Sequence, residues 1–365
     1  MLLRGQRVMV PFKVKIGLPR GSAVTDKGNQ DLTLKLSSPG LGFASIKPTL
    51  PRLAPDDPLW RTAEAANQYV LAAKSPATRR AYAADWRHFG AWCLEHGLLS
   101  LPAEPATVAL YLAALGATHK PATITRRLTA ITAVHGEADF PSPANLSHRL
   151  VADTLHGIRR TLGTSQKAKE PLSVTQLVKV LDHLEGGLLA ARDRALLLIG
   201  FSGGLRRSEL AALSIEKLEW HKTGITIQLD RSKTDQEGEG REVEIPIGIH
   251  PETCPVRALQ NWLERANLKD GRVFRRVDRH GNVGAALDKD SIGVIVQRSV
   301  KRAGLAAKHY GGHSLRAGFA TQAYLKGATE LEIMQQTGHR SLSMVRRYIR
   351  EGKKLRQTAA GKLGL

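Results

Sequence analysis

Cysteine is scarce in this 365-residue chain, and the two that occur, Cys93 and Cys254, lie far apart. There is no CxxC pair and no cluster of Cys and His, so the sequence supports neither a zinc site nor a framework of disulfides. Motifs of the GxxxxGK(S/T) and HExxH types are missing, as is an acidic cluster suited to Mg²⁺. We therefore expect no metal and no cofactor, and a reducing cytoplasm as the location.

Long apolar runs are also absent, since no segment reaches the roughly 18 apolar residues of a membrane-spanning helix. The stretch MLLRGQRVMVPFKVKIGLPR at the start is interrupted by charges too often for a secretory signal. The sequence thus predicts no membrane insertion.

Acidic residues are few: 33 Asp and Glu stand against 54 Lys and Arg, which gives a formal net charge of +21. A charge of this size repels itself unless a polyanion neutralises it, so nucleic acid is the leading partner. An anionic membrane surface is the alternative. It is disfavoured because the basic residues are spread along the chain and do not gather on one amphipathic helix.

The first half of the chain divides into two parts. Residues 1–55 are aperiodic and rich in Pro, Gly, Ser and Lys, which predicts a mostly disordered leader. Residues 56–162 show helical periodicity, and one apolar stripe at i, i+4, i+7 and i+11 comprises Tyr82, Trp86, Phe89 and Cys93. The helices expected in this all-α domain are 58–74, 75–97, 105–116, 121–138 and 147–163.

A polar stretch, 163–171, predicts a linker to a second domain at 172–365. In that domain the period of the apolar residues changes from 3.6, typical of a helix, to 2, typical of a strand, within 224–247. This change predicts a β-hairpin. The fold class is therefore mainly α with a small β-hairpin or sheet. The helices expected around the hairpin are 172–184, 191–204, 205–220, 254–266, 288–304, 313–327, 329–338 and 341–354.

Two segments near the hairpin contain candidate functional residues. In GGLRRSEL, Arg206 and Glu209 are three residues apart and share a helix face, although a surface ion pair would give the same pattern. In RSKTD, Lys233 lies near the hairpin turn, where a long cation reaches into a groove. An edge-strand lysine that discourages aggregation is the alternative.

Two further segments lie near the end of the chain. In GGHSLRAG, His313 and Arg316 follow a Gly-Gly break at a helix start, which suits either phosphate binding or capping and packing. In TGHRSLSMVRRYI, His339 lies between two helices and Tyr348 follows Arg346 and Arg347. Tyr348 is either a half-buried anchor of an amphipathic helix or a nucleophile whose phenolate the basic neighbours favour.

The order and spacing of these residues resemble the tyrosine recombinases, the phage integrase family that includes Cre, the Xer proteins and lambda integrase. The stretch SPATRRAYAADWRHFGAWC similarly resembles the start of that family's core-binding domain. The resemblance implies a SAM-like helical core-binding domain and a catalytic domain that form a C-shaped clamp around double-stranded DNA. Some members of the family have a separate arm-binding domain, but we expect none here, because residues 1–55 are short and aperiodic.

The same resemblance implies a role for each candidate. Arg206 and Arg316 would hold the scissile phosphate, and Tyr348 would attack it to form a 3′-phosphotyrosyl link. His313 would take the phenol proton, and Lys233 would protonate the leaving 5′-oxygen. His339 would bind the phosphate, and Glu209 would orient its neighbours. Of the adjacent arginines, the GLRxSE pattern favours Arg206 over Arg207.

Further expectations concern DNA contacts and assembly. Arg79, Arg80, Arg126 and Arg127 are candidates for DNA contact on the helical domain, with solvated helix faces as the alternative. The resemblance implies a tetramer on DNA that exchanges strands through a four-way junction, accessory DNA-bending proteins, a nucleoid-associated location and a mobile-element origin. The basic tail would dock on a neighbouring subunit through Leu355, Leu363 and Leu365, or would be a frayed end.

Three alternatives stay open at this point. A type IB topoisomerase uses similar chemistry to relax supercoils, but the resemblance to a core-binding domain disfavours it. A catalytically silent DNA-binding protein would need only the basic surface and not this full set of residues. A helix-turn-helix regulator would leave the hairpin and Tyr348 without a purpose.

Overall fold

The computed structural model describes residues 54, 56–164, 169–230 and 240–352. The chain divides into two compact units, Met1–Gln166 and Lys167–Leu365. The expected disordered leader, 1–55, lies almost wholly outside the described residues, as does the middle of the expected linker. Lys233 and the three leucines of the tail also lie outside them.

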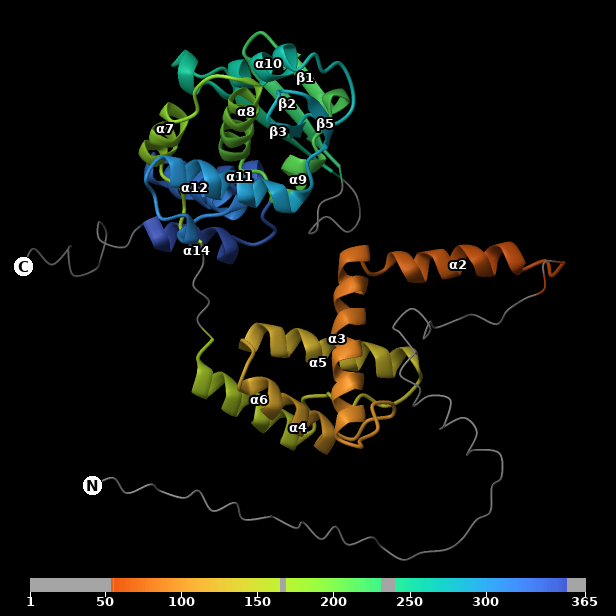
Figure 1. The fold of residues 1–365 in the computed structure, drawn as a ribbon. Coiled ribbons are helices and arrows are strands. Elements are labelled where there is room, and N and C mark those ends of the chain that lie inside the picture. Colours follow the sequence, from red (N-terminus) through yellow and green to blue (C-terminus); the bar gives the residue numbers. More distant parts are fainter. Residues whose placement is uncertain (1–53, 55, 165–168, 231–239, 353–365) are drawn as a thin grey trace, which may run out of the picture. The chain divides into compact units, whose positions relative to one another are not determined.

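The described residues of the first unit fold into helices joined by turns and loops (Figure 1). Proline occupies the first position of three of its helices, where its fixed φ favours helix initiation and no N–H is needed. Ser75 caps one of them by accepting a hydrogen bond from the Thr78 N–H at 3.2 Å. The helices are α2 (Trp60–Ala72), α3 (Pro76–Glu95), α4 (Pro105–Gly116), α5 (Pro121–Glu137) and α6 (Arg149–Leu162).

The core of this unit forms where α3 packs on α5 and α4 packs on α6. The predicted stripe is confirmed, because Trp86, Phe89 and Cys93 are buried in this core and Tyr82 packs against it. At the end of α3, Gly97 has a φ of +65°, a conformation that favours glycine. The sequence periodicity therefore identified the packed face of α3 correctly.

The second unit is also mainly helical (Figure 1). The predicted N-cap at Ser173 is confirmed, because its hydroxyl accepts from the Gln176 N–H at 3.1 Å within a capping box. The helices are α7 (Val174–Asp182), α8 (Leu188–Ser202), α9 (Arg207–Ala212), α10 (Pro255–Arg265), α11 (Lys289–Arg302), α12 (Gly312–Leu325), α13 (Glu330–Thr337) and α14 (Leu342–Gly352).

Two antiparallel sheets complete this unit. One has the order β1 (Leu218–His221), β2 (Gly224–Leu229) and β3 (Arg241–Pro246), and the other pairs β4 (Arg275–Val277) with β5 (Val283–Ala286). The predicted hairpin is β2–β3, in which Ile225 opposes Ile245 and Ile227 opposes Val243. These four side chains are buried, so the alternating pattern marked the core face of the hairpin.

Two expectations about secondary structure in this unit were wrong. The helix expected at 205–220 ends at Ala212, because Ser214 bridges to Arg272 and 218–221 pairs with β2 instead. Strand pairing outweighs helix propensity there. The β4–β5 hairpin was missed, because strands of three and four residues with an irregular register leave almost no periodic signal.

The core of the second unit is built around α8, which packs on α10 and α12 and is buried along most of its length. A smaller apolar cluster of Ala320, Ile333, Val345 and Ile349 joins α12, α13 and α14. Among the described helices, none is long and apolar enough to cross a membrane. Since α12 and α14 both contribute to this small cluster, side chains from these two helices lie close together although they are distant in sequence.

Candidate active site

Tyr348 lies on α14 with its ring half-buried against the small apolar cluster. Its hydroxyl is 2.8 Å from Nε2 of His313, which lies in the first turn of α12. Although the His313 side chain keeps contact with solvent, desolvation by the surrounding atoms and repulsion by Arg316 lower the pKa of His313. A neutral imidazole is therefore placed to accept the phenol proton.

His339 also lies beside the phenol, with its ring centroid 5.5 Å from that of Tyr348. It is buried, and its Nδ1 is 2.6 Å from the hydroxyl of Thr337. That hydroxyl donates its one hydrogen to the Ile333 carbonyl at 2.5 Å, so it accepts from His339. Burial, followed by repulsion from Arg316, lowers the pKa of His339 to about 3. The ring is thus neutral, with its hydrogen on Nδ1.

Arg316 lies on α12 one turn after His313 and is 2% exposed. Its Nη1 donates to the carbonyls of Gly204, at 2.7 Å, and Thr337. Its Nη2 is buried and has no hydrogen-bond partner among the described residues. Burial and the nearby Arg206 lower the pKa of Arg316 to about 10, which leaves it charged at neutral pH. A buried cation with an unused donor is suited to an anionic ligand.

Arg206 is the N-cap residue of α9, and its guanidinium donates to Glu209 at 2.5 Å and to the Gly338 carbonyl at 2.7 Å. Arg207 instead lies 3.2 Å from Asp290 at the start of α11. The geometry therefore separates the two adjacent arginines, and Arg206 is the one beside His339.

A residue that the sequence analysis missed, Arg241, also lies in this cluster. It is the first residue of β3, and it forms a 3.0 Å ion pair with Glu209. Arg206 and Arg241 thus share a single carboxylate, and Arg316 lies near enough for the charges of Arg206 and Glu209 to act on it. The only signal in the sequence was a basic residue at a strand start, which is common on surfaces and predicts nothing by itself.

The two arginines before Tyr348 differ in their surroundings. Arg346 forms a 3.0 Å ion pair with Glu330 of α13, whereas the charge of Arg347 acts on His313 and helps to lower its pKa. The basic environment expected around Tyr348 therefore comes mainly from α9, α12 and β3 and only in part from its own helix.

The four arginines predicted to contact DNA differ in their exposure to solvent. Arg80 on α3 is exposed and Arg79 is half-buried. Arg126 on α5 is half-exposed and pairs with Asp85 at 2.8 Å.

Arg127 is only 9% exposed, so it does not lie on a solvated helix face. Its guanidinium donates to Tyr111 at 3.1 Å and to His88 at 2.9 Å, and it lies 3.6 Å from Asp85. These contacts hold Arg127 within the helical unit, and contact between Arg127 and DNA stays a prediction.

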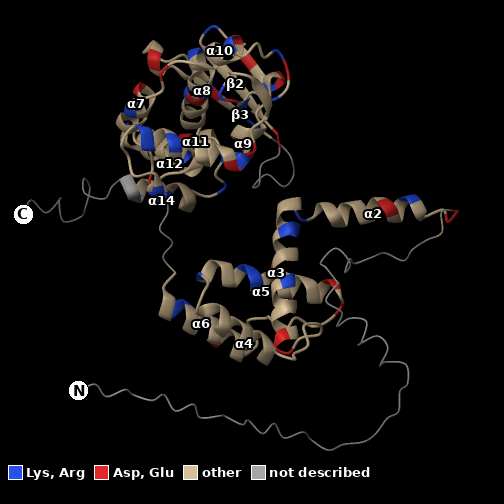
Figure 2. Cartoon of the chain, in the orientation of Figure 1, with Lys and Arg blue, Asp and Glu red and all other residues tan. Residues whose placement is uncertain are grey.

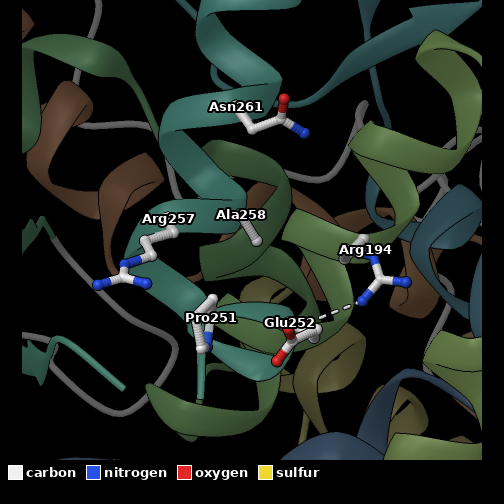
Figure 3. A pocket seen from close by; sticks show the side chains of 6 residues that line it. All are labelled: Arg194, Pro251, Glu252, Arg257, Ala258 and Asn261. Atoms are coloured by element: carbon white, nitrogen blue, oxygen red, sulfur yellow. Dashed lines mark hydrogen bonds between the residues drawn. The ribbon is translucent and has the colours of Figure 1, made fainter. Parts of the chain in front are cut away.

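A pocket in the described part of the second unit lies apart from the cluster around Tyr348. Lys and Arg occur on elements of both units (Figure 2). A pocket beside α10 is lined by Arg194, Pro251, Glu252, Arg257, Ala258 and Asn261, and Arg194 donates to the Glu252 carbonyl at 2.8 Å (Figure 3). None of these six residues belongs to the cluster around Tyr348.

A phenol hydrogen-bonded to a neutral imidazole, near three guanidinium groups and one carboxylate, is suited to nucleophilic attack on a phosphate ester. Comparison with known proteins identifies the family. The profile of the phage integrase family matches residues 170–354. The chain belongs to the phage integrase family, and it is a site-specific tyrosine recombinase.

An integrase/recombinase xerD homolog from Selenomonas ruminantium is 37% identical over 293 residues, which cover 80% of this chain and 86% of that protein. Tyrosine recombinase XerC from Xanthomonas campestris pv. campestris is 25% identical over 204 residues, 56% of this chain and 58% of its own length.

Two solved structures share the fold. The XerH site-specific recombinase in a post-cleavage complex with palindromic difH substrate has a TM-score of 0.59 at 21% identity, covering 80% of this chain and 82% of that one. A lambda integrase dimer bound to a COC′ core site has a TM-score of 0.53 at 15% identity, and the match covers 80% of this chain and 78% of that one.

Proposed function

We propose that the chain binds double-stranded DNA, cleaves one strand through a 3′-phosphotyrosyl bond at Tyr348 and rejoins it to a different strand. The observation that carries this proposal is the 2.8 Å hydrogen bond between the Tyr348 hydroxyl and His313, together with the Nη2 of Arg316, which has no hydrogen-bond partner among the described residues. The phenol, the base that accepts its proton and the cation that attracts a phosphate come from α14 and α12.

The chemistry follows from this arrangement. His313 accepts the phenol proton as Tyr348 attacks phosphorus, and the bond from phosphorus to the 5′-oxygen breaks. Arg206 and Arg316 stabilise the charge that grows on the nonbridging oxygens. The leaving 5′-oxygen needs a proton, which the family resemblance assigns to Lys233. The phosphotyrosyl bond keeps the phosphate activated, so a 5′-hydroxyl from another strand reverses the step.

DNA as the substrate is supported by charge and by similarity. A chain with a net charge of +21 attracts a polyanion strongly, and the structures that share its fold are recombinases bound to DNA substrates. We further propose that four copies assemble on two duplexes, since exchange of two duplexes requires four strand cleavages. The helical first unit would hold the duplex through Arg79, Arg80 and Arg126.

The test uses a supercoiled plasmid that carries two copies of the DNA site. The site is first identified by sequencing fragments retained by Tyr348→Phe, a variant that is expected to bind without cleaving. Wild type is expected to delete the DNA between the sites and give two circles. Relaxation without deletion would indicate topoisomerase activity instead, and binding without either product would indicate a catalytically silent protein.

A further inference from the structure

Arg241 lies outside the four sequence segments that contain the candidate active-site residues, yet it contacts one of those residues, Glu209. Its Nη2 lies 3.0 Å from Oε2 of Glu209, and its Nη1 donates to the Gln336 carbonyl at 2.5 Å. The side chain is only 17% exposed, and its Nε is buried without a hydrogen-bond partner among the described residues. A guanidinium in this position connects β3 to both α9 and α13.

Glu209 is the partner that Arg241 shares with Arg206. One carboxylate oxygen accepts from the Arg206 side chain at 2.5 Å, and the other accepts from the Arg206 backbone N–H at 2.7 Å. Burial alone would raise the pKa of Glu209, but attraction to Arg241 and the hydrogen bonds from Arg206 outweigh burial and lower it. The carboxylate is thus ionised and holds Arg206 in one orientation.

The same two arginines hold the chain just before His339. Arg241 binds the Gln336 carbonyl, and Arg206 binds the Gly338 carbonyl at 2.7 Å. Gly338 has a φ of +64°, and a Cβ there would lie 2.7 Å from Nε of Arg241. The glycine therefore permits both the turn and the close approach of Arg241.

We propose that Arg241 is a positioning residue for DNA cleavage, an inference that rests on the proposed function. Arg241 completes the ion pairing of Glu209, so that Glu209 fixes the guanidinium of Arg206 toward the scissile phosphate. It also fixes the turn from which His339 extends. Removal of Arg241 leaves a buried carboxylate with one cation in place of two and loosens Arg206 without touching the reacting atoms.

The test is a double-mutant cycle in the full chain. Single-turnover cleavage and equilibrium binding are measured on the same duplex for wild type, Arg241→Gln, Glu209→Gln and the double variant. We expect Arg241→Gln to slow cleavage about 10- to 100-fold, since one buried group loses its charged partner, with the dissociation constant nearly unchanged. The double variant should be no slower than the slower single variant.

A matched control is Arg298→Gln, which removes the 2.6 Å ion pair between α11 and the buried Asp193 of α8. It should lower stability without slowing cleavage by the folded protein. Arg241→Lys should recover part of the rate, because one ammonium retains the charge but not the paired donors.

Additive losses in the double variant, or cleavage by Arg241→Gln as fast as by Arg298→Gln, would overturn this inference and leave the proposed function intact. Failure of wild type to cleave would remove the proposed function and this inference together.

Discussion

At the scale of single residues, Thr337 determines which nitrogen of His339 carries a hydrogen. The Thr337 hydroxyl donates to Ile333 and so accepts from Nδ1, which leaves Nε2 of the neutral ring as an acceptor. The phosphate contact that the family resemblance implies for His339 therefore requires a proton on Nε2. The low pKa of His339, about 3, indicates that the anion itself must favour that protonation.

This tautomer gives a direct prediction for Thr337→Val, a change of similar size without the hydroxyl. The ring nitrogen chemical shifts of His339 should show the Nδ1–H form in wild type and in Thr337→Ser, and a mixture of tautomers in Thr337→Val. The Nε2–H form in the wild type would contradict the assignment.

A second residue, His135 in the first unit, should make stability depend on pH. It is fully buried, accepts from the Ala103 N–H at 2.9 Å through Nε2 and lies 2.9 Å from the Ile131 carbonyl through Nδ1. Burial lowers the pKa of His135 in the folded state.

His135 in the unfolded chain therefore binds a proton more readily than His135 in the folded protein. The contribution of neutral His135 to the free energy of unfolding is complete above about pH 6.5. It is lost as pH falls below that value, by at most about 1.4 kcal/mol per pH unit. Urea unfolding followed by the fluorescence of Trp86, whose ring centroid lies 6.0 Å from that of His135, measures this. A free energy of unfolding equal at pH 7.5 and pH 5.5 would contradict the prediction.

At the scale of elements, Leu172, the first residue after the linker, packs directly on the helix that carries His313 and Arg316. The Leu172 N–H donates to the Ser314 carbonyl at 3.0 Å, and a Cβ on Gly318 would lie 2.1 Å from the Leu172 carbonyl oxygen. Position 318 therefore tolerates only glycine without movement of α12 or of Leu172.

Gly318→Ala should destabilise the second unit by about 1–3 kcal/mol or more, as overpacking does, and should slow cleavage by displacing α12. Gly157→Ala is the matched control, because it is also within a helix and a Cβ there meets nothing within 4 Å. The control should be neutral or slightly stabilising. Thermal unfolding and single-turnover cleavage of both variants check this, and equal effects would count against the packing argument.

Some helices, strands and site residues could be predicted from the sequence, and others could not. Helices with a clear apolar stripe, such as α3, and strands that alternate, such as β3, were found because one face of each is buried. The end of α9 at Ala212 depends on pairing with distant residues, which local periodicity does not record. Likewise, Arg316, His339 and Tyr348 were named from spacing and resemblance, whereas Arg241 and Thr337 act through contacts that only the folded chain creates.

At the scale of the whole molecule, α9, α12, α13, α14 and β3 of the second unit bring residues that are distant in sequence to one place. We propose that Tyr348 is the nucleophile at this place. Tyr324 on α12 is a good control, because it is also partly buried against the small apolar cluster.

The most direct measurement incubates wild type, Tyr348→Phe and Tyr324→Phe with DNA carrying the bound site. The reaction is quenched with detergent, the DNA and protein are digested, and peptides are analysed by mass spectrometry. We predict a nucleotide attached to the peptide that contains Tyr348 in wild type and in Tyr324→Phe, and no adduct in Tyr348→Phe. An adduct on any other residue, or one that persists in Tyr348→Phe, would contradict the account.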